Sequence, residues 1–272
     1  MPIESSFVAT PYGKFHVEAV GAGKPVLLIH GGTASAREWR PVLEALGQHA
    51  RCVAIDRLGC GLSDRSAAGY DRATLTNSLF ACADALGFDR FGVIGQSFGG
   101  FWGLSMAFAA PERISRLIVV DSAGGPMTDE EVAARRARAE ARRQAAPITS
   151  EAEREAAIER TMTTIFANPS RVPASFREDL RWQMAHADPG QRAAVANDFE
   201  RLARERYDLL KIPTLVVWGE ADSMISAERG RRLAEAIPGA RYVGLPGVGH
   251  TCQIEAPTEF VAAVAPFLDE TA

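Results

Sequence analysis

Short runs of β-branched and other apolar residues alternate along the chain with longer stretches in which apolar residues recur at helical spacing. The strands that this pattern predicts cover residues 15–20, 26–29, 52–55, 91–94, 117–120, 215–218 and 242–245. The predicted helices cover residues 74–86, 102–109, 227–236 and 258–268. Several of the strands are apolar throughout, which is typical of strands buried on both faces. The pattern therefore predicts an α/β fold, with a mostly parallel central sheet that helices cover on both sides.

The pattern changes after Gly124, where Ala, Arg and Glu begin to dominate and no strand-like run appears before Ile212. From residue 129 to residue 160, seven Arg stand against eight Asp and Glu, a balance that is typical of solvated helix faces. Turn-forming residues that divide this segment into about four helices stand at Pro147, Asn168-Pro169, Pro173 and Asp188-Pro189-Gly190. We therefore expect a core domain of residues 1–124 and 212–272 and a helical lid, or cap, of residues 125–211.

Length and charge limit the classes of partner. The chain has 272 residues, of which 47% are hydrophobic and 24% charged, as in a globular protein. Its net charge of −4 leaves no basic surplus for phosphates, so we expect no nucleic-acid partner. The apolar runs are too short to cross a bilayer, and the N-terminus has no signal-peptide pattern. We expect no membrane association and a cytoplasmic location; a homodimer stays open.

The cysteines do not indicate a disulfide framework or a metal site. Cys52, Cys60, Cys82 and Cys252 form no CxxC pair, and no set of His, Cys and Asp has metal-ligand spacing. We expect four free thiols, with Cys252 as a packing residue, and neither a metal nor another cofactor.

The segment Gly95-Gln96-Ser97-Phe98-Gly99 connects a predicted strand to a predicted helix. Glycine on both sides of Ser97 allows a sharp turn that holds the serine hydroxyl at the carboxyl end of the strand. This setting predicts that Ser97 is a nucleophile. The alternative is a glycine-rich connection whose serine has no chemical role.

A serine hydroxyl needs a base within hydrogen-bond reach. His250 follows the predicted strand 242–245 in a glycine-rich loop, at the same sheet edge as Ser97, where ligands bind in open α/β folds. We therefore expect His250 to be the base. The other histidines are expected to be surface, packing or loop-bracing residues: His16, His30, His49 and His186.

The carboxylate that orients the base has two main candidates. Asp222 follows the predicted strand 215–218, and the order Ser97, Asp222, His250 is the one that the strand–turn–helix serine hydrolases use. Asp121 ends the preceding predicted strand and is the rival, while Glu220 is expected to face solvent or cap a helix. We predict that Asp222 is the catalytic acid.

A loop of small residues, His30-Gly31-Gly32-Thr33, follows the predicted strand 26–29. Such a loop can turn a backbone N–H toward the serine. We therefore expect an oxyanion hole made by the backbone N–H groups of Gly32 and Phe98, the residue after the nucleophile.

Taken together, these segments resemble the α/β-hydrolase family, in its lidded branch of esterases, lactonases and carbon–carbon bond hydrolases. His30-Gly31-Gly32 resembles the family's oxyanion loop, and Asp56-Arg57-Leu58-Gly59-Cys60-Gly61-Leu62-Ser63-Asp64 resembles its DxxGxGxSD loop. Gly95 to Gly100 resembles its nucleophile elbow. Trp218-Gly219-Glu220-Ala221-Asp222 resembles its acid turn, and Gly249-His250 resembles its base loop. The resemblance runs almost from end to end. From the residues alone, Asp56, Ser63 and Asp64 are expected to brace loops.

Departures from the family's patterns narrow the expected activity. Epoxide hydrolases and dehalogenases of this family use an Asp nucleophile, whereas position 97 is Ser. Carbon–carbon bond hydrolases often have an aromatic residue after the base, where Thr251 stands, and perhydrolase relatives usually have one at the position of Gly32. The resemblance implies a hydrolase of carboxylic esters, lactones or thioesters, whose small-molecule substrate has an apolar acyl portion.

Two other functions stay open. The first is carbon–carbon cleavage of a ring-fission diketone by the same residues, and the second is a ligand-binding receptor that kept the fold and lost turnover. Aromatic residues and a methionine could line an acyl pocket, although at helical spacing such residues more often belong to a core: Phe98, Trp102, Phe166, Phe176, Trp182, Met184 and Phe199.

Overall fold

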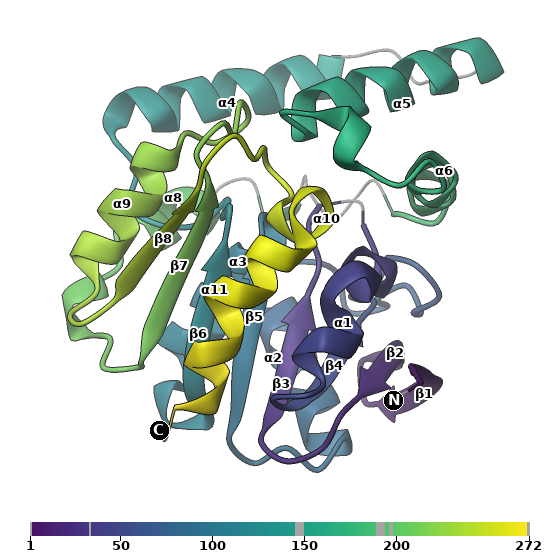
Figure 1. Ribbon diagram of the computed structural model, residues 1–272. Coiled ribbons are helices and arrows are strands. Elements are labelled where there is room, and N and C mark those ends of the chain that lie inside the picture. The colour runs from purple at the N-terminus through teal and green to yellow at the C-terminus, as the bar shows by residue number, and fades with distance from the viewer. Residues whose placement is uncertain (1, 33, 145–149, 189–193, 196–197, 271–272) are drawn as a thin grey trace.

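The computed structural model describes residues 2–32, 34–144, 150–188, 194–195 and 198–270. A single sheet has the strand order β1-β2-β4-β3-β5-β6-β7-β8 (Figure 1). The strands are β1 (Glu4–Thr10), β2 (Gly13–Val20), β3 (Pro25–Ile29), β4 (Arg51–Ile55), β5 (Phe91–Gln96), β6 (Ile114–Val120), β7 (Thr214–Gly219) and β8 (Arg241–Leu245). β2 is antiparallel to both of its neighbours, β1 and β4, and the neighbouring strands from β4 to β8 in this order are parallel to each other. The mostly parallel sheet is as predicted, with β1 in addition.

Helices cover both faces of the sheet (Figure 1). Because side chains alternate along a strand, Leu27 and Ile29 pack in one buried cluster and Leu28 in another. The first cluster includes side chains of α2 (Arg72–Ala85), α3 (Phe98–Ala109) and α9 (Ala227–Ala236). The second includes side chains of α1 (Arg40–Leu46) and α11 (Pro257–Asp269). The remaining short helices outside the insertion are η1 (Ala36–Trp39), η2 (Pro111–Arg113) and α10 (Cys252–Glu255).

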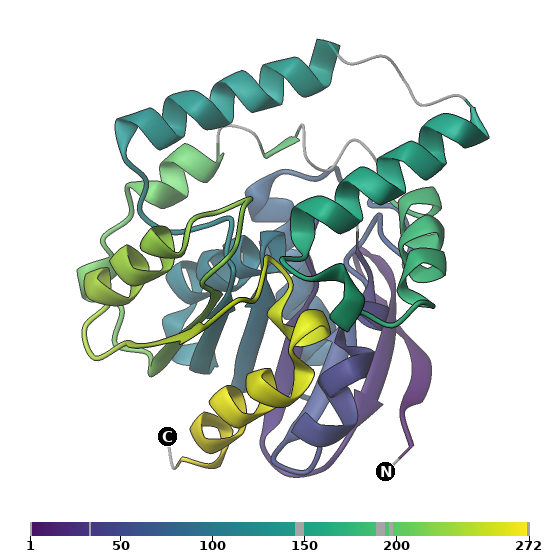
Figure 2. The same cartoon turned by 45° about the horizontal axis from the view of Figure 1, so that its top comes forward.

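In the described part of the segment between β6 and β7, the regular elements are all helices. It contains α4 (Asp129–Gln144), α5 (Glu151–Ile165), η3 (Pro169–Arg171), α6 (Phe176–Ala185), α8 (Asp198–Ala203) and η4 (Tyr207–Leu209). In Figure 1 and Figure 2, α4 and α5 lie across the edge of the sheet at which the parallel strands end. The breaks at Asn168-Pro169 and Pro173 separate α5 from α6 as predicted, whereas Pro147 and Pro189-Gly190 lie outside the described residues.

The inserted segment is not packed as one unit. Phe199 and Leu202 of α8 belong to the larger core cluster, together with Phe101 of α3. Ile158 of α5 and Leu180 of α6 belong to a separate small cluster. The division into a core of residues 1–124 and 212–272 and a lid of residues 125–211 stays a prediction. In the described part of the chain, no helix has the length and apolar character needed to cross a membrane.

Candidate active site

Ser97 stands in the turn between β5 and α3, with a backbone conformation that residues other than glycine rarely adopt. Its φ is 50° and its ψ is −110°. Two backbone hydrogen bonds of 2.8 Å hold the turn, from Ser97 N to Val120 O and from Ala123 N to Ser97 O. The strain is therefore borne by contacts with the exit of β6, the next strand in the sheet.

Glycine is required two residues before and two residues after Ser97, because neighbouring backbone atoms leave no space for a side chain at these positions. A Cβ at Gly99 would overlap the carbonyl oxygen of Ile29, and a Cβ at Gly95 would overlap that of Gly99. Helix α3 begins at Phe98, four residues before the predicted start at residue 102, because both Gly99 and Gly100 are helical. The elbow is thus tighter than the apolar pattern alone indicates.

The three residues predicted to act together are in hydrogen-bond contact. The Ser97 Oγ lies 2.8 Å from His250 Nε2, and His250 Nδ1 lies 2.7 Å from Asp222 Oδ2. The second Asp222 oxygen accepts the N–H groups of Met224 at 2.8 Å and Ile225 at 3.0 Å. Burial alone would lower the pKa of His250, but the hydrogen bond and charge of Asp222 outweigh burial, and the pKa lies above its usual value. The arrangement can move a proton from Ser97 to His250.

Asp121 lies beside this set, but it makes no hydrogen bond to the imidazole. Its Oδ1 accepts the N–H of Gly219 at 2.8 Å, and its Oδ2 accepts the N–H of Cys252 at 3.4 Å. Burial and the charge of Asp222 raise the pKa of Asp121 to about 7. Glu220 is turned away and binds Tyr242 Oη at 2.9 Å.

The other histidines are bound elsewhere. His16 Nδ1 lies 2.9 Å from Asp56, whose carboxylate also accepts the N–H groups of Ala36 and Leu62. His49 binds Asp269, and His186 stacks on Trp182. The expected loop-bracing role fits the contacts of Asp56.

The glycine loop after β3 is held by His30 and Arg57. His30 Nε2 accepts the N–H of Arg57 at 3.1 Å, and its Nδ1 donates to Gly31 O at 2.8 Å. Burial lowers the pKa of His30 to about 3, so its imidazole is neutral. Arg57 Nη2 donates to the carbonyls of Gly31 and Gly32, both at 2.8 Å. Gly32 and Phe98 border the same cavity as Ser97; Thr33 lies outside the described residues.

A second buried carboxyl, not expected from the sequence, connects this loop to the base loop. Glu38 accepts the N–H of Gly31 and the side-chain amide of Gln253, both at 2.8 Å. Gln96, the neighbour of Ser97, donates to the carbonyl of His250 at 2.7 Å. Burial raises the pKa of Glu38 to about 7. No pattern in the sequence singles out Glu38, whereas Gln96 stands within the predicted elbow.

The base loop is also bound to the end of α5. His250 N donates to Ile165 O at 2.7 Å. Glu255 accepts the N–H groups of Gly249 at 2.8 Å, Ala167 at 3.2 Å and Asn168 at 2.7 Å. The inserted segment therefore contributes directly to the position of His250.

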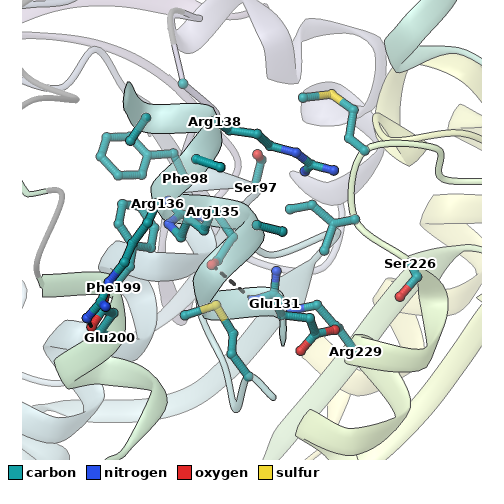
Figure 3. A pocket seen from close by; sticks show the side chains of 18 of the residues that line it. Ser97, Phe98, Glu131, Arg135, Arg136, Arg138, Phe199, Glu200, Ser226 and Arg229 are labelled. Atoms are coloured by element: carbon teal, nitrogen blue, oxygen red, sulfur yellow. Dashed lines mark hydrogen bonds and ion pairs between the residues drawn. The ribbon is translucent and has the colours of Figure 1, made fainter. Parts of the chain in front are cut away.

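Ser97 opens into a cavity of about 830 Å³ between α3, α4, α8 and α9 (Figure 3). Of the residues considered for an acyl pocket, Phe98 and Phe199 border it. Phe166, Phe176 and Met184 belong instead to the small α5–α6 cluster. Charged residues also border the cavity, so it is more polar than expected: Glu131, Arg135, Arg136, Arg138, Glu140, Glu200, Asp222 and Arg229. Among the described residues no group of acids, His and Cys could hold a metal ion, and all four cysteines are buried free thiols.

Comparison with known proteins gives consistent matches over nearly the whole chain. Residues 24–257 match the family model described as the alpha/beta hydrolase fold. A 2-hydroxymuconate semialdehyde hydrolase of Pseudomonas sp. (strain CF600) is 31% identical, over 92% of this chain and 88% of that protein. One of Pseudomonas putida is 32% identical, with 92% and 89% covered. The crystal structure of a hydrolase from Pseudomonas aeruginosa PA01 superposes with a TM-score of 0.81 at 27% identity, covering 98% of this chain and 99% of that one.

Proposed function

Because the chain belongs to the alpha/beta hydrolase fold family, we propose that it is a serine hydrolase that cleaves a carboxylic ester, lactone or thioester. The observation that carries the proposal is the unbroken series of hydrogen bonds from Ser97 through His250 to Asp222. A serine hydroxyl paired in this way is an activated nucleophile.

The proposed reaction has two halves. Ser97 Oγ attacks the acyl carbon while His250 Nε2 takes its proton, and the N–H groups of Gly32 and Phe98 stabilise the oxyanion. His250 then returns the proton to the leaving oxygen or sulfur, and an acyl-enzyme forms on Ser97. Water repeats the sequence and releases the acid. Asp222 keeps the imidazole in the tautomer that the reaction needs.

We assign residues 125–211 a lid function within this proposal. The position of α4 and α5 across the sheet edge supports it, as does the contribution of Arg135, Arg138 and Phe199 to the cavity (Figure 3). A lid so placed would select substrates rather than change the reaction.

Covalent labelling of the purified protein with a fluorophosphonate tests the nucleophile. We expect the parent protein to be labelled and Ser97→Ala to lose labelling and to lose ester turnover by roughly a thousand-fold or more. Ser226→Ala is the matched control, because Ser226 also borders the cavity and its side chain caps no helix amide. A Ser97→Ala protein with a tenth of the parent rate would refute the assignment, and an unlabelled, inactive parent would favour the receptor.

Carbon–carbon bond cleavage is the second candidate, favoured by the two 2-hydroxymuconate semialdehyde hydrolases among the relatives. Thr251 at the position after the base weighs against it. Steady-state rates for a ring-fission diketone and for short-chain esters decide between the two, because the same triad would act on both. If kcat/KM is higher for the diketone than for the esters, the diketone becomes the leading substrate class.

A further inference from the structure

Arg229 is a buried cation in the wall of the cavity that contains Ser97. It extends from α9, is 9% exposed, and lies beside Glu131 in Figure 3. Its Nη2 donates to the carbonyl of Ala123 at 3.3 Å. Within the part of the chain that the structure describes, its Nε has no acceptor and its guanidinium forms no ion pair. A buried charge with so few partners is costly unless another group completes its environment.

The neighbouring carboxylates are already bound. Glu131 accepts Arg232 Nη2 through Oε1 and the N–H of Thr128 through Oε2. Asp222, also at the cavity, binds His250 and two backbone amides. Arg229 therefore lies near two carboxylates, Glu131 and Asp222, and near a second guanidinium group, Arg232, but both carboxylates have their hydrogen bonds with other partners.

The other charged residues around the cavity are engaged elsewhere or exposed. Glu200 is paired with Arg136, and Glu140 and Arg135 are engaged in other contacts. Arg138 is exposed, and in Figure 3 its side chain extends from α4 toward the Ser97 side of the cavity. Both Arg138 and Arg229 therefore favour an entering anion.

Ala123 connects this cation to the nucleophile. Its N–H donates to Ser97 O at 2.8 Å, and its carbonyl accepts from Arg229. Arg229 and Ser97 also border the same cavity, so one substrate molecule can contact both of them. The planar guanidinium matches a carboxylate in two-point contact.

We propose that Arg229 is an anion subsite and that the substrate is an ester whose acyl part ends in a carboxylate, such as a half-ester of a short dicarboxylic acid. This inference rests on the proposed serine hydrolase function. The subsite binds the non-reacting end of the substrate and takes no part in the bond changes at Ser97.

Matched substrates test the subsite. Monoethyl succinate, glutarate and adipate are compared with ethyl butyrate, valerate and hexanoate, which have the same acyl lengths without the carboxylate. We expect kcat/KM for at least one half-ester to exceed that of its neutral partner by about tenfold or more. Arg229→Met should remove this preference, so that the ratio of kcat/KM for each half-ester to kcat/KM for its neutral partner falls to about one.

Arg231→Met is the matched control, because Arg231 is on the same helix and pairs with Glu220 outside the cavity. Should Arg229→Met fail to fold, competitive inhibition of the parent by glutarate but not glutaramide gives the same information. Turnover of both ester series without a preference, or inhibition by neither compound, would overturn the subsite alone. Absence of all turnover together with absence of fluorophosphonate labelling would refute the proposed function and this substrate class with it.

Discussion

Asp222 Oδ2 lies 2.7 Å from His250 Nδ1, while Asp121, at the end of the adjacent strand, accepts the backbone N–H groups of Gly219 and Cys252. We therefore expect Asp222→Asn to reduce kcat by orders of magnitude, because an amide in this position favours the wrong imidazole tautomer. Asp121→Asn should have a much smaller effect on kcat. Stopped ester assays on both purified variants, with melting curves to confirm folding, measure the difference. The reverse ranking would contradict the triad.

The pH dependence of labelling should report the raised pKa of His250. In the proposed reaction the neutral imidazole is the base, so the labelling rate should rise with pH as His250 loses its proton. Because Asp222 outweighs the effect of burial and raises this pKa, the midpoint of the acid limb should lie above the usual value of about 6.5. Fluorophosphonate labelling rates across that range provide the measurement. A midpoint at or below the usual value would be inconsistent with the Asp222 contact.

Glu38 should make stability depend on pH. Its folded-state pKa is raised from 4.5 to about 7, so the folded protein holds a proton that the unfolded chain releases. The stability that this bound proton contributes is fully present below the unfolded pKa and is lost as pH rises through about 7. For a shift of this size, the free energy of unfolding falls by roughly 3 kcal/mol over that range. Glu38→Gln, which stays neutral, should therefore gain stability relative to the parent between about pH 5 and about pH 8.

Urea unfolding of both proteins at the two pH values measures that gain. Glu259→Gln is the control, because Glu259 is an exposed carboxylate paired with Arg171. A parent and a Glu38→Gln variant whose stability difference does not change with pH would show that Glu38 is ionised throughout this range.

The elbow should tolerate no side chain at Gly99. A methyl group there would overlap the carbonyl of Ile29, so Gly99→Ala should cost about 1–3 kcal/mol or more in unfolding free energy. Gly103→Ala on the same helix is the comparison, since its Cβ would meet only side-chain carbons of Leu117 and Val93 at 3.2 Å. Denaturant unfolding of the two variants gives the ranking. Equal stability of both would refute the tight packing of the turn against β3.

The elements with a strong apolar pattern could be predicted, and so could the edge at which Ser97, Asp222 and His250 meet, because all three follow strands of one parallel sheet. β1 was missed because it is an edge strand whose residues are mostly exposed, and α1 because it is only seven residues long. Glu38 binds Gln253, 215 positions away along the chain, and such a pair depends on packing that no local pattern describes. The corner around Arg229 likewise appears only once α9 and the exit of β6 are side by side.

The hydrogen bond from His250 N to Ile165 O has a consequence for engineering the protein. A chimera that exchanges residues 125–211 for the corresponding part of a relative would also replace the carbonyl that binds the backbone N–H of His250. Grafts that keep residues 165–168 of this chain, and with them the contacts to His250 and Glu255, should retain a working nucleophile. The end of α5 thus helps to position the proposed base, and libraries for new substrates are best confined to α4, which borders the cavity.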